Sequence, residues 1–348
     1  MQRSQGGEHD DDAVARAAWL HFVGGLTQSE VARRLDVPTT RAHRYIARAQ
    51  SRGLVRVFVD VAASDCVALE TALIERHGLS TCRVAMETPE PEPLPLRALG
   101  AVGGDWLMRA IASGRHGVIG IGNGRTLSAV VNGMGRIAAG PTRFVSILGG
   151  LTRSGAANPY DVIHALAQKT GGEAFLMPAP LFADTAEDRR VLMAQSALAV
   201  TTRLVAEASL IVVGIGDVGV SSGVAPAATT ALADREAIGA IRARGARAEI
   251  LGQFLDAAGA PVPTPHDARV MAPALDALKG REVVAVAGGA SKVEAIRASL
   301  GSGLLSGLIT DEATARALVG DADRDGGGDN NDERQGGDTS CTNGSAIS

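Results

Sequence analysis

Aromatic side chains are scarce in this 348-residue chain: Phe, Trp and Tyr make up 3% of it, whereas hydrophobic residues make up 45%. The core must therefore be built from Val, Ile, Leu and Ala, which is typical of parallel sheets buried on both faces. No stretch approaches the roughly eighteen apolar residues that cross a bilayer, and the polar start MQRSQGGEHDDD does not resemble a signal peptide. These absences favour a cytoplasmic protein with no membrane partner.

Cysteine and lysine are scarce as well. Cys66, Cys82 and Cys341 lie far apart, which excludes a disulfide framework and gives no zinc signature. We expect neither a metal nor another cofactor. Lysine occurs at only three positions, 169, 279 and 292, so a lysine in a turn between a strand and a helix is informative.

Positive charge is concentrated near the N-terminus. Residues 13–56 carry eight Arg against two acids, a net charge of +6 in a chain whose total is -4. A basic module of this size suggests nucleic-acid binding, although an ordinary solvated helix face is the alternative. The acidic, Gly-rich residues 320–348 and the polar residues 1–12 are expected to be disordered.

Apolar runs alternate with amphipathic segments from about residue 66 to residue 319. The runs predict strands at 118–121, 144–148, 174–177, 210–215, 249–251, 283–287 and 304–309. The amphipathic segments predict helices at 96–112, 126–134, 159–169, 188–206, 234–244, 292–299 and 311–318. Gly114, Gly171 and Gly245 stand where helix C-termini need a left-handed residue. The alternation predicts an α/β fold, a parallel sheet with helices on both faces.

Residues 13–60 have the pattern of a helix-turn-helix domain. Helices are expected at 13–23, 28–35 and 40–50, with a short strand at 54–59. Thr27 and Glu30 form a capping box at the start of the second helix. Asp36 takes the place of the usual turn glycine, since Asp tolerates the left-handed conformation better than most residues. The expected buried face consists of Val31, Ala32, Leu35, Val37, Ala42, Tyr45 and Ile46.

The exposed face of the third helix is rich in arginine, which can bind guanine bidentately in the major groove. We predict base contacts from Thr39, Thr40, Arg41, His43 and Arg44, and phosphate contacts from Gln28, Arg48 and Arg52. The alternative is a helical hairpin used for packing or dimerisation. Because one such unit buries too little to specify a site, a homo-oligomer, dimer or tetramer, is expected on double-stranded operator DNA.

Four loops follow predicted strands, three of them Gly-rich: GIGNGRT, GGLT, GGASK and TDE. Ligands of open α/β sheets bind at the carboxyl ends of the strands, where glycine lets the backbone approach them and helix N-termini offer free N–H groups. Three candidates could have a structural role instead. Lys292 could be a solvated lysine at a helix start, Asp311 an acid that favours a helix N-terminus, and Asn158 the cap of a helix that begins at Pro159. The predicted effector-binding residues are Gly122, Asn123, Gly124, Arg125, Thr126, Gly149, Gly150, Asn158, Asp256, Lys292, Thr310 and Asp311, with Asp217 weighed beside them.

The chain resembles the SorC family of sugar-responsive transcription regulators. The resemblance rests on GLTQSEVARRL, the arginine-bearing third helix and GLVRV, and farther along on LGAVGGDWLMRAI, GIGNGRTL, ILGGLTR, NPYDVIHALA, VVGIGD, VAGGASKVEAI and GLITDEATA. It covers about residues 13–319 and is strongest to regulators of polyol catabolism operons, the erythritol type among them.

The resemblance implies a winged-helix-like DNA-binding domain at residues 13–60. It also implies a Rossmann-like effector-binding and oligomerisation domain at residues 66–319, with a fold similar to sugar-phosphate isomerases. The effector would be a sugar, a polyol or a sugar phosphate. In phosphate-binding relatives an Arg precedes the second Gly-Gly loop, but this chain has Leu148 there, which favours a neutral effector.

Two functions from different classes are compatible with this fold. One is a DNA-binding regulator of a carbohydrate or polyol catabolism operon. The other is a sugar-phosphate isomerase or deaminase-like enzyme with an appended basic domain. Isomerisation needs a base beside the substrate carbon, commonly a histidine or a tuned carboxylate. None of the four histidines of the large domain, His77, His116, His164 and His266, lies in a Gly-rich loop, so the sequence favours the regulator, which is not an enzyme.

Overall fold

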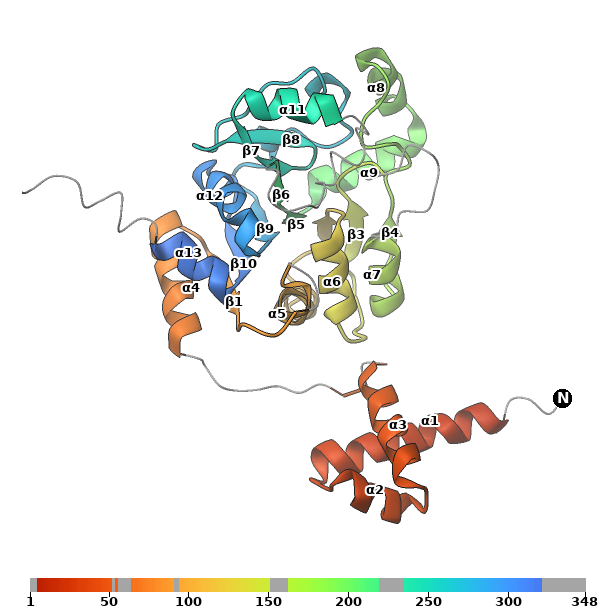
Figure 1. Ribbon diagram of the computed structural model, residues 1–348. Helices are drawn as coiled ribbons and strands as arrows, with labels where there is room; N and C mark the ends of the chain where they lie inside the picture. The colour runs from red at the N-terminus through yellow and green to blue at the C-terminus, as the bar shows by residue number, and fades with distance from the viewer. Residues whose placement is uncertain are drawn as a thin grey trace, which may run out of the picture.

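The computed structural model describes residues 5–51, 54–55, 64–90, 94–150, 162–218 and 235–320. Three helices form an N-terminal unit: α1 (Gln5–Ala18), α2 (Gln28–Leu35) and α3 (Thr39–Ser51). The rest of the described chain is an α/β domain (Figure 1). None of the described helices is long and apolar enough to span a membrane.

Local signals in the sequence set the boundaries of the N-terminal helices. The Thr27 hydroxyl accepts a hydrogen bond from the Glu30 amide, and the Glu30 carboxylate accepts one from the Thr27 amide, so the predicted capping box is confirmed. Asp36 ends α2 with a φ of 52°, in the left-handed conformation expected there. The predicted buried face is confirmed as well, with Val31, Ala32, Ala42, Tyr45 and Ile46 in one cluster and Leu35 and Val37 packed against it.

The first helix differs from the sequence prediction. It begins at Gln5, within the segment expected to be disordered, and continues past Ala18 as a π-helix, η1 (Trp19–Val23). Asp10 forms an ion pair with Arg48 of α3, which ties the acidic start of α1 to the third helix. Most of the predicted exit strand at 54–59, and the acidic tail after residue 320, lie outside the described residues.

A seven-stranded sheet in which every pair is parallel forms the centre of the α/β domain. Its strands are β1 (Thr81–Ala85), β2 (Val118–Ile121), β3 (Arg143–Ser146), β4 (Ala174–Phe175), β5 (Leu210–Gly214), β9 (Glu282–Val286) and β10 (Gly307–Asp311), in the spatial order β1-β10-β9-β5-β2-β3-β4. The chain moves from β2 toward β4, returns to β5 on the other side of β2, and then moves toward β10. The strand order therefore reverses between β2 and β5, the position where such sheets bind ligands.

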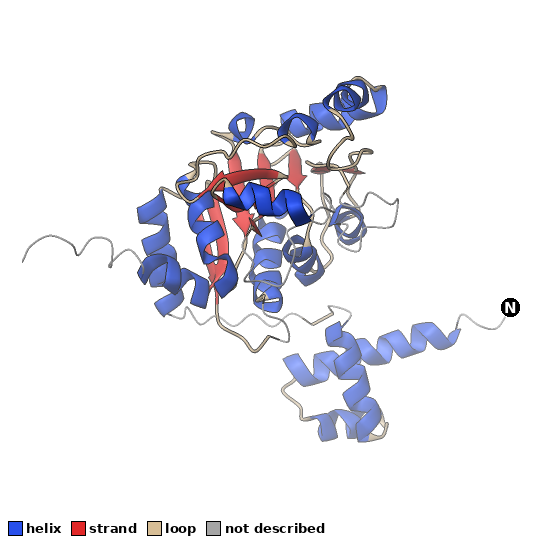
Figure 2. Ribbon diagram, turned by 45° about the horizontal axis from the view of Figure 1, so that its top comes forward, coloured by secondary structure: helices blue, strands red, loops and turns tan. Residues whose placement is uncertain are grey.

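Helices cover both faces of this sheet (Figure 2). Side chains of α4 (Ser64–His77), α9 (Ser196–Glu207), α12 (Val293–Gly301) and α13 (Glu312–Gly320) belong to one buried cluster. Those of α5 (Leu96–Ala112), α6 (Arg125–Gly133) and α7 (Val162–Thr170) belong to another. Successive residues of β5 alternate between the two clusters, as the two-residue period of a strand requires. The predicted two-sided parallel sheet is confirmed.

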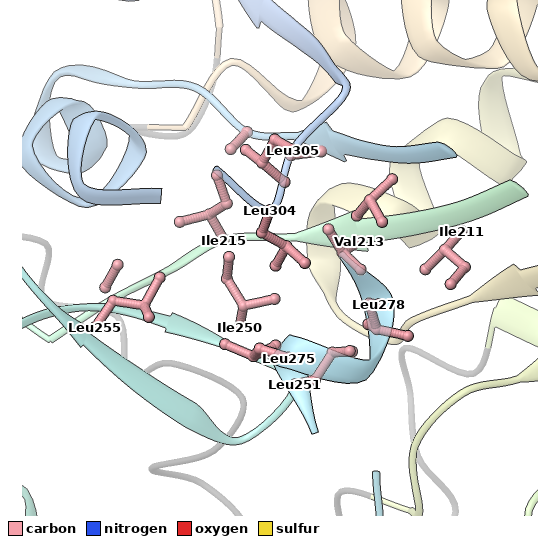
Figure 3. Close-up of a cluster of buried hydrophobic side chains, with 14 of the residues drawn as sticks. Ile211, Val213, Ile215, Ile250, Leu251, Leu255, Leu275, Leu278, Leu304 and Leu305 are labelled. Carbon is pink, nitrogen blue, oxygen red and sulfur yellow. The ribbon is translucent and has the colours of Figure 1, made fainter. Parts of the chain in front are cut away.

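A second, antiparallel sheet was not predicted. It consists of β6 (Gly216–Asp217), β7 (Ala246–Ile250) and β8 (Gln253–Asp256). The prediction that the strand near 249–251 belongs to the parallel sheet is therefore wrong. Because β6 follows β5 almost directly, the small sheet lies beyond the carboxyl end of β5 (Figure 1). Side chains of β5, β7 and β8 meet in one apolar cluster with those of η3 (Leu275–Leu278) (Figure 3).

The other boundaries follow the sequence with few exceptions. The predicted helix at 188–206 is two helices, α8 (Ala186–Met193) and α9, because the backbone is extended at Gln195 within a continuous apolar pattern. Helix α4 and strand β1 were not predicted from the sequence, and β10 begins three residues later than expected. The remaining elements are α11 (Arg235–Ala243), η2 (Asp267–Arg269) and η4 (Ala290–Lys292).

Helices α5 and α6 are packed so closely that their contact requires glycine. A Cβ atom on Gly133 would lie 2.1 Å from the carbonyl oxygen of Gly100. Such an overlap with backbone cannot be relieved by rotating a side chain, so the two helices would have to separate and open the core between them.

We therefore expect Gly133→Ala to lower the free energy of unfolding by at least about 1–3 kcal/mol. The control is Gly239→Ala in α11, where a Cβ atom would meet no heavy atom within 4 Å. That substitution should raise the free energy of unfolding by about 0.5–1 kcal/mol, since alanine favours a helix interior. Denaturant titrations of the three proteins measure both effects, and equal stability of the two variants would contradict the packing argument.

Candidate functional site

The loop after β2 lies at the point where the strand order reverses. Gly122 is buried and its amide donates to the Val212 carbonyl of β5, which holds the loop against the neighbouring strand. Gly124 has a φ of 129° and is followed by α6, which begins at Arg125. The first amides of α6 thus face the carboxyl edge with the partial positive charge of a helix N-terminus. Asn123 and Arg125 are partly exposed, whereas Thr126 is buried.

Lys292 lies at the same edge, after β9. It is the N-cap residue of α12, and its Nζ donates to the Ile215 carbonyl oxygen 2.7 Å away, just beyond β5. Burial and the nearby Arg125 guanidinium lower the pKa of Lys292 to about 8, while Glu249 and Asp217 partly oppose this effect. Because β2, β5 and β9 are neighbours, the structure brings Lys292 and the Arg125 loop together, as the sequence predicted.

Two buried carboxyl groups complete this cluster, which we call the carboxyl-edge cluster: Arg125, Asp217, Glu249 and Lys292. Asp217 and Glu249 lie on β6 and β7 and are 8% and 6% exposed. The Glu249 carboxylate accepts a hydrogen bond from the Gly252 amide, and burial raises the pKa of Glu249. Glu249 was missed in the sequence analysis. The signal was present, since it is the one acid inside the apolar run AEIL.

Two other candidates, Asp311 and Asp256, have hydrogen-bond partners within the protein. Both carboxylate oxygens of Asp311 accept hydrogen bonds, from Gly289 and from Thr314. Asp256 accepts from the amides of Ala258 and Ala260 within its own turn. The Asp311 and Asp256 carboxylates are therefore engaged by the protein itself, and the expectation that they contact an effector is not supported by the geometry.

The remaining effector candidates contribute less to the cluster. The hydroxyl of Thr310 is fully buried and has no hydrogen-bond partner among the described residues. Gly149 and Gly150 follow β3, where their amides bind the carbonyls of Met271 and Ala179. A Cβ atom on Gly149 would lie 2.2 Å from the Pro180 carbonyl oxygen, so close backbone packing explains this glycine. Asn158 lies outside the described residues.

The third helix of the N-terminal unit presents the predicted polar face. Ala42, Tyr45, Ile46 and Ala49 are buried, which turns the other side of α3 outward. The guanidinium of Arg41 lies 5.8 Å from the centre of the Tyr45 ring, a cation–π contact that restricts Arg41 while leaving it exposed. The exposed residues of this face are Thr39, Thr40, Arg41, His43 and Arg44.

The residues predicted to contact phosphates are less uniform. Gln28, the first residue of α2, is partly exposed. Arg48 is paired with Asp10 and Asp11 of α1, so it already has anionic partners within the chain. Arg52 lies outside the described residues.

These features belong to a known class of protein. Residues 61–320 match the Sugar-bind family of sugar-binding domains, and the chain therefore belongs to this family, which confirms the predicted resemblance to SorC-type regulators. The erythritol catabolism regulatory protein EryD of Brucella abortus (strain 2308) is 48% identical over 311 residues, covering 89% of this chain and 97% of that protein. The transcriptional regulator LsrR of Enterobacter sp. (strain 638) is 31% identical over 316 residues, covering 89% and 93%.

Solved structures agree on the fold. The full-length sorbitol operon regulator SorC of Klebsiella pneumoniae superimposes with a TM-score of 0.65 at 23% identity, covering 89% of this chain and 99% of that one. The probable sor operon regulator of Shigella flexneri gives a TM-score of 0.64 at 24% identity and covers 73% of this chain and 99% of that one.

The lowered pKa of Lys292 predicts a pH-dependent stability. Its pKa is about 8 in the folded protein and near the ordinary 10.5 in the unfolded chain. Between these values the unfolded chain binds more protons, so the contribution of Lys292 to the free energy of unfolding rises with pH. Below pH 8 the folded protein carries the full cost of a desolvated ammonium group.

Lys292→Met should therefore stabilise the protein by about 1–3 kcal/mol at pH 7, and the gain should shrink as the pH rises from 8 to 10.5. Chemical denaturation at several pH values measures this difference. Lys279→Met is the control, because Lys279 is exposed and, among the described residues, pairs with Asp276 of the same turn, and it should change stability by less than about 0.5 kcal/mol. If Lys292→Met stabilises the protein equally at every pH, the ammonium charge is not the cause of the stabilisation.

Proposed function

We propose that this chain is a DNA-binding transcription regulator of a carbohydrate or polyol catabolism operon. The observation that carries the proposal is the likeness to EryD, which is named as a regulator of erythritol catabolism and matches nearly the whole length of both proteins. The alternative of an isomerase or deaminase-like enzyme has no support from these relatives, which are named as regulators. The regulator would act in the cytoplasm as a dimer or tetramer, because specific recognition needs two half-sites.

The N-terminal unit is proposed to be the helix-turn-helix. Its left-handed turn at Asp36 and the capping box at Thr27 support this assignment, as does the exposed basic face of α3. In such units the recognition helix, which is α3 here, enters the major groove with its N-terminal residues. Arg44 and Arg41 would then reach base edges, while Gln28 at the N-terminus of α2 would bind a phosphate.

Arg44→Ala should weaken binding to the DNA upstream of the chain's own operon by about tenfold to a hundredfold, since a bidentate contact to guanine contributes about 1–3 kcal/mol. Arg242→Ala in α11 removes the same charge from an exposed arginine of the α/β domain and should leave operator affinity nearly unchanged. Gel shifts at one moderate salt concentration compare the two. Operator affinity of the Arg44 variant equal to that of the parent would sink the assignment of α3.

The carboxyl-edge cluster is proposed to hold the effector, a small polyol or sugar. Lys292 and Arg125 supply N–H donors, and the carboxyl groups of Asp217 and Glu249 supply acceptors, so together they match hydroxyl groups, which both donate and accept. The two acids would repel a phosphate dianion bound next to Lys292. This favours a neutral effector, in line with Leu148 in the place of an arginine, and erythritol is the first compound to test because of the likeness to EryD.

Erythritol should raise the melting temperature of the parent protein, because a ligand of the folded state stabilises it by mass action. Lys292→Ala should bind erythritol about tenfold to a hundredfold more weakly, since hydroxyls lose their donor in a partly dry site, a loss of about 1–3 kcal/mol. The variant should still bind its operator but no longer respond to erythritol. Calorimetry that gives the same affinity for Lys292→Ala and the parent would remove Lys292 from the site, and Lys279→Ala is the matched control.

A further inference from the structure

A buried carboxylate joins the Lys292 loop to the last helix of the domain. Asp311 ends β10, and its Oδ1 accepts the Thr314 amide 3.0 Å away, which caps α13. Its Oδ2 accepts both the Thr314 hydroxyl, at 2.6 Å, and the Gly289 amide, at 2.9 Å. The Gly289 amide also donates to the Thr314 hydroxyl oxygen, at 2.8 Å. Asp311 and Thr314 are 6% and 0% exposed, so water does not compete for these bonds.

The loop depends on this arrangement, which we call the Asp311–Thr314 clasp. A Cβ atom on Gly288 would lie 2.1 Å from the Asp311 Oδ2, so only glycine allows the carboxylate to approach the loop this closely. Three residues after Gly289, the amide of Lys292 donates to the Gly289 carbonyl. A displacement of Lys292 by a ligand therefore moves the same peptide units that the clasp holds.

On its other side, the clasp is connected through α13 to α4. Arg316 of α13 donates to Asp65 of α4, at 3.2 Å. Arg76 near the end of α4 donates to the carbonyls of Leu318 and Val319, each at 3.1 Å. Buried side chains of α4 and α13 belong to the same apolar cluster. Among the described elements, α4 is the next helix after α3 in the sequence, so α4 is where the chain enters the α/β domain from the N-terminal unit.

We propose that Asp311 and Thr314 are positioning residues that couple occupancy of the effector site to α4, and through it to operator binding. The proposal rests on the proposed function and adds the route by which the site acts. The Gly289 amide and the Thr314 hydroxyl of α13 donate to the same oxygen, Oδ2 of Asp311. The loop therefore cannot move unless α13 follows or a buried hydrogen bond is lost. Losing such a bond has a high energetic cost, which favours concerted movement.

Thr314→Val tests the clasp with little change of shape, because it removes the hydroxyl and keeps the branched side chain. Asp311→Asn tests it independently: the amide oxygen can still cap α13, whereas the NH2 group would face the Gly289 N–H. Thr170→Val is the matched control. Thr170 is also buried, its hydroxyl donates to the Leu166 carbonyl and accepts the Gly172 amide, and it lies at the end of α7 on the other face of the sheet.

Hydrogen exchange of the full chain provides a readout that needs no effector. In Thr314→Val and Asp311→Asn, the amides of the Gly288–Lys292 loop, of α13 and of α4 should exchange about fivefold or more faster than in the parent. Thr170→Val should accelerate exchange near α7 and β4 only. Unchanged exchange of α4 in both clasp variants would overturn the proposal, because the clasp would then support only its own loop.

Operator affinity with and without saturating erythritol provides the second readout. Coupling between two sites commonly changes affinity by about 5–150-fold. In Thr314→Val we expect erythritol binding to be retained by calorimetry, while the ratio of the two operator dissociation constants falls to within about twofold of unity. A ratio equal to that of the parent and of Thr170→Val would overturn the coupling. If erythritol leaves the parent unaffected, the proposed effector is wrong, and the exchange comparison alone decides the role of the clasp.

Discussion

Burial of one parallel sheet between two layers of helices is the constraint on which the rest of the structure depends. The central strands β2 and β5 send alternate side chains into the two apolar clusters and carry no polar side chain, so polar groups collect where these strands end. Parallel pairing then places those ends at one edge. The neighbouring positions of β9, β5 and β2 bring together a lysine, an aspartate and an arginine that are far apart in the sequence.

The same burial explains the chemistry of the carboxyl-edge cluster. The small antiparallel sheet adds Glu249 and packs its apolar side chains against those of β5 and η3 (Figure 3), and burial lowers the pKa of Lys292 nearby. Among the described residues, the partners of this part-buried ammonium group are a carbonyl oxygen and nearby carboxyl groups, so an incoming hydroxyl oxygen would add a favourable contact. The Lys292 ammonium group thus lies, at a cost in stability, where hydroxyl groups of the proposed ligand would bind it.

Most of the fold could be predicted from the sequence because its signals are local. The capping box of Thr27, the left-handed residue at Asp36 and the continuous apolar strands each follow from a few adjacent residues. The parts that escaped prediction depend on contacts distant in sequence. The pairing of β6 with β7 and the contact of α1 with α3, in which Asp10 pairs with Arg48, both join residues distant in sequence.

The same difference between local signals and distant contacts decides which residues of the candidate site could be predicted. Lys292 and the Gly122–Thr126 loop follow apolar strands and could be found by that rule, and the structure brings Lys292 and Arg125 together. The same rule placed Asp311 in the site, but its carboxylate is occupied by Gly289 and Thr314, which no spacing in the sequence reveals. Glu249 was missed because it lies inside a strand, where its burial depends on a sheet that was not expected.

The ion pairs between Arg48 and the acids of α1 bear on how binding to a polyanion would respond to salt. When an arginine neutralises a DNA phosphate, a condensed cation is released, and the slope of affinity against salt concentration counts such releases. Arg48 differs from Arg44 because Asp10 and Asp11 already act as its counter-ions. A phosphate that takes their place frees two carboxylates, which attract cations in turn. The acidic start of the chain would therefore make the salt slope shallower than the number of basic side chains on α3 suggests.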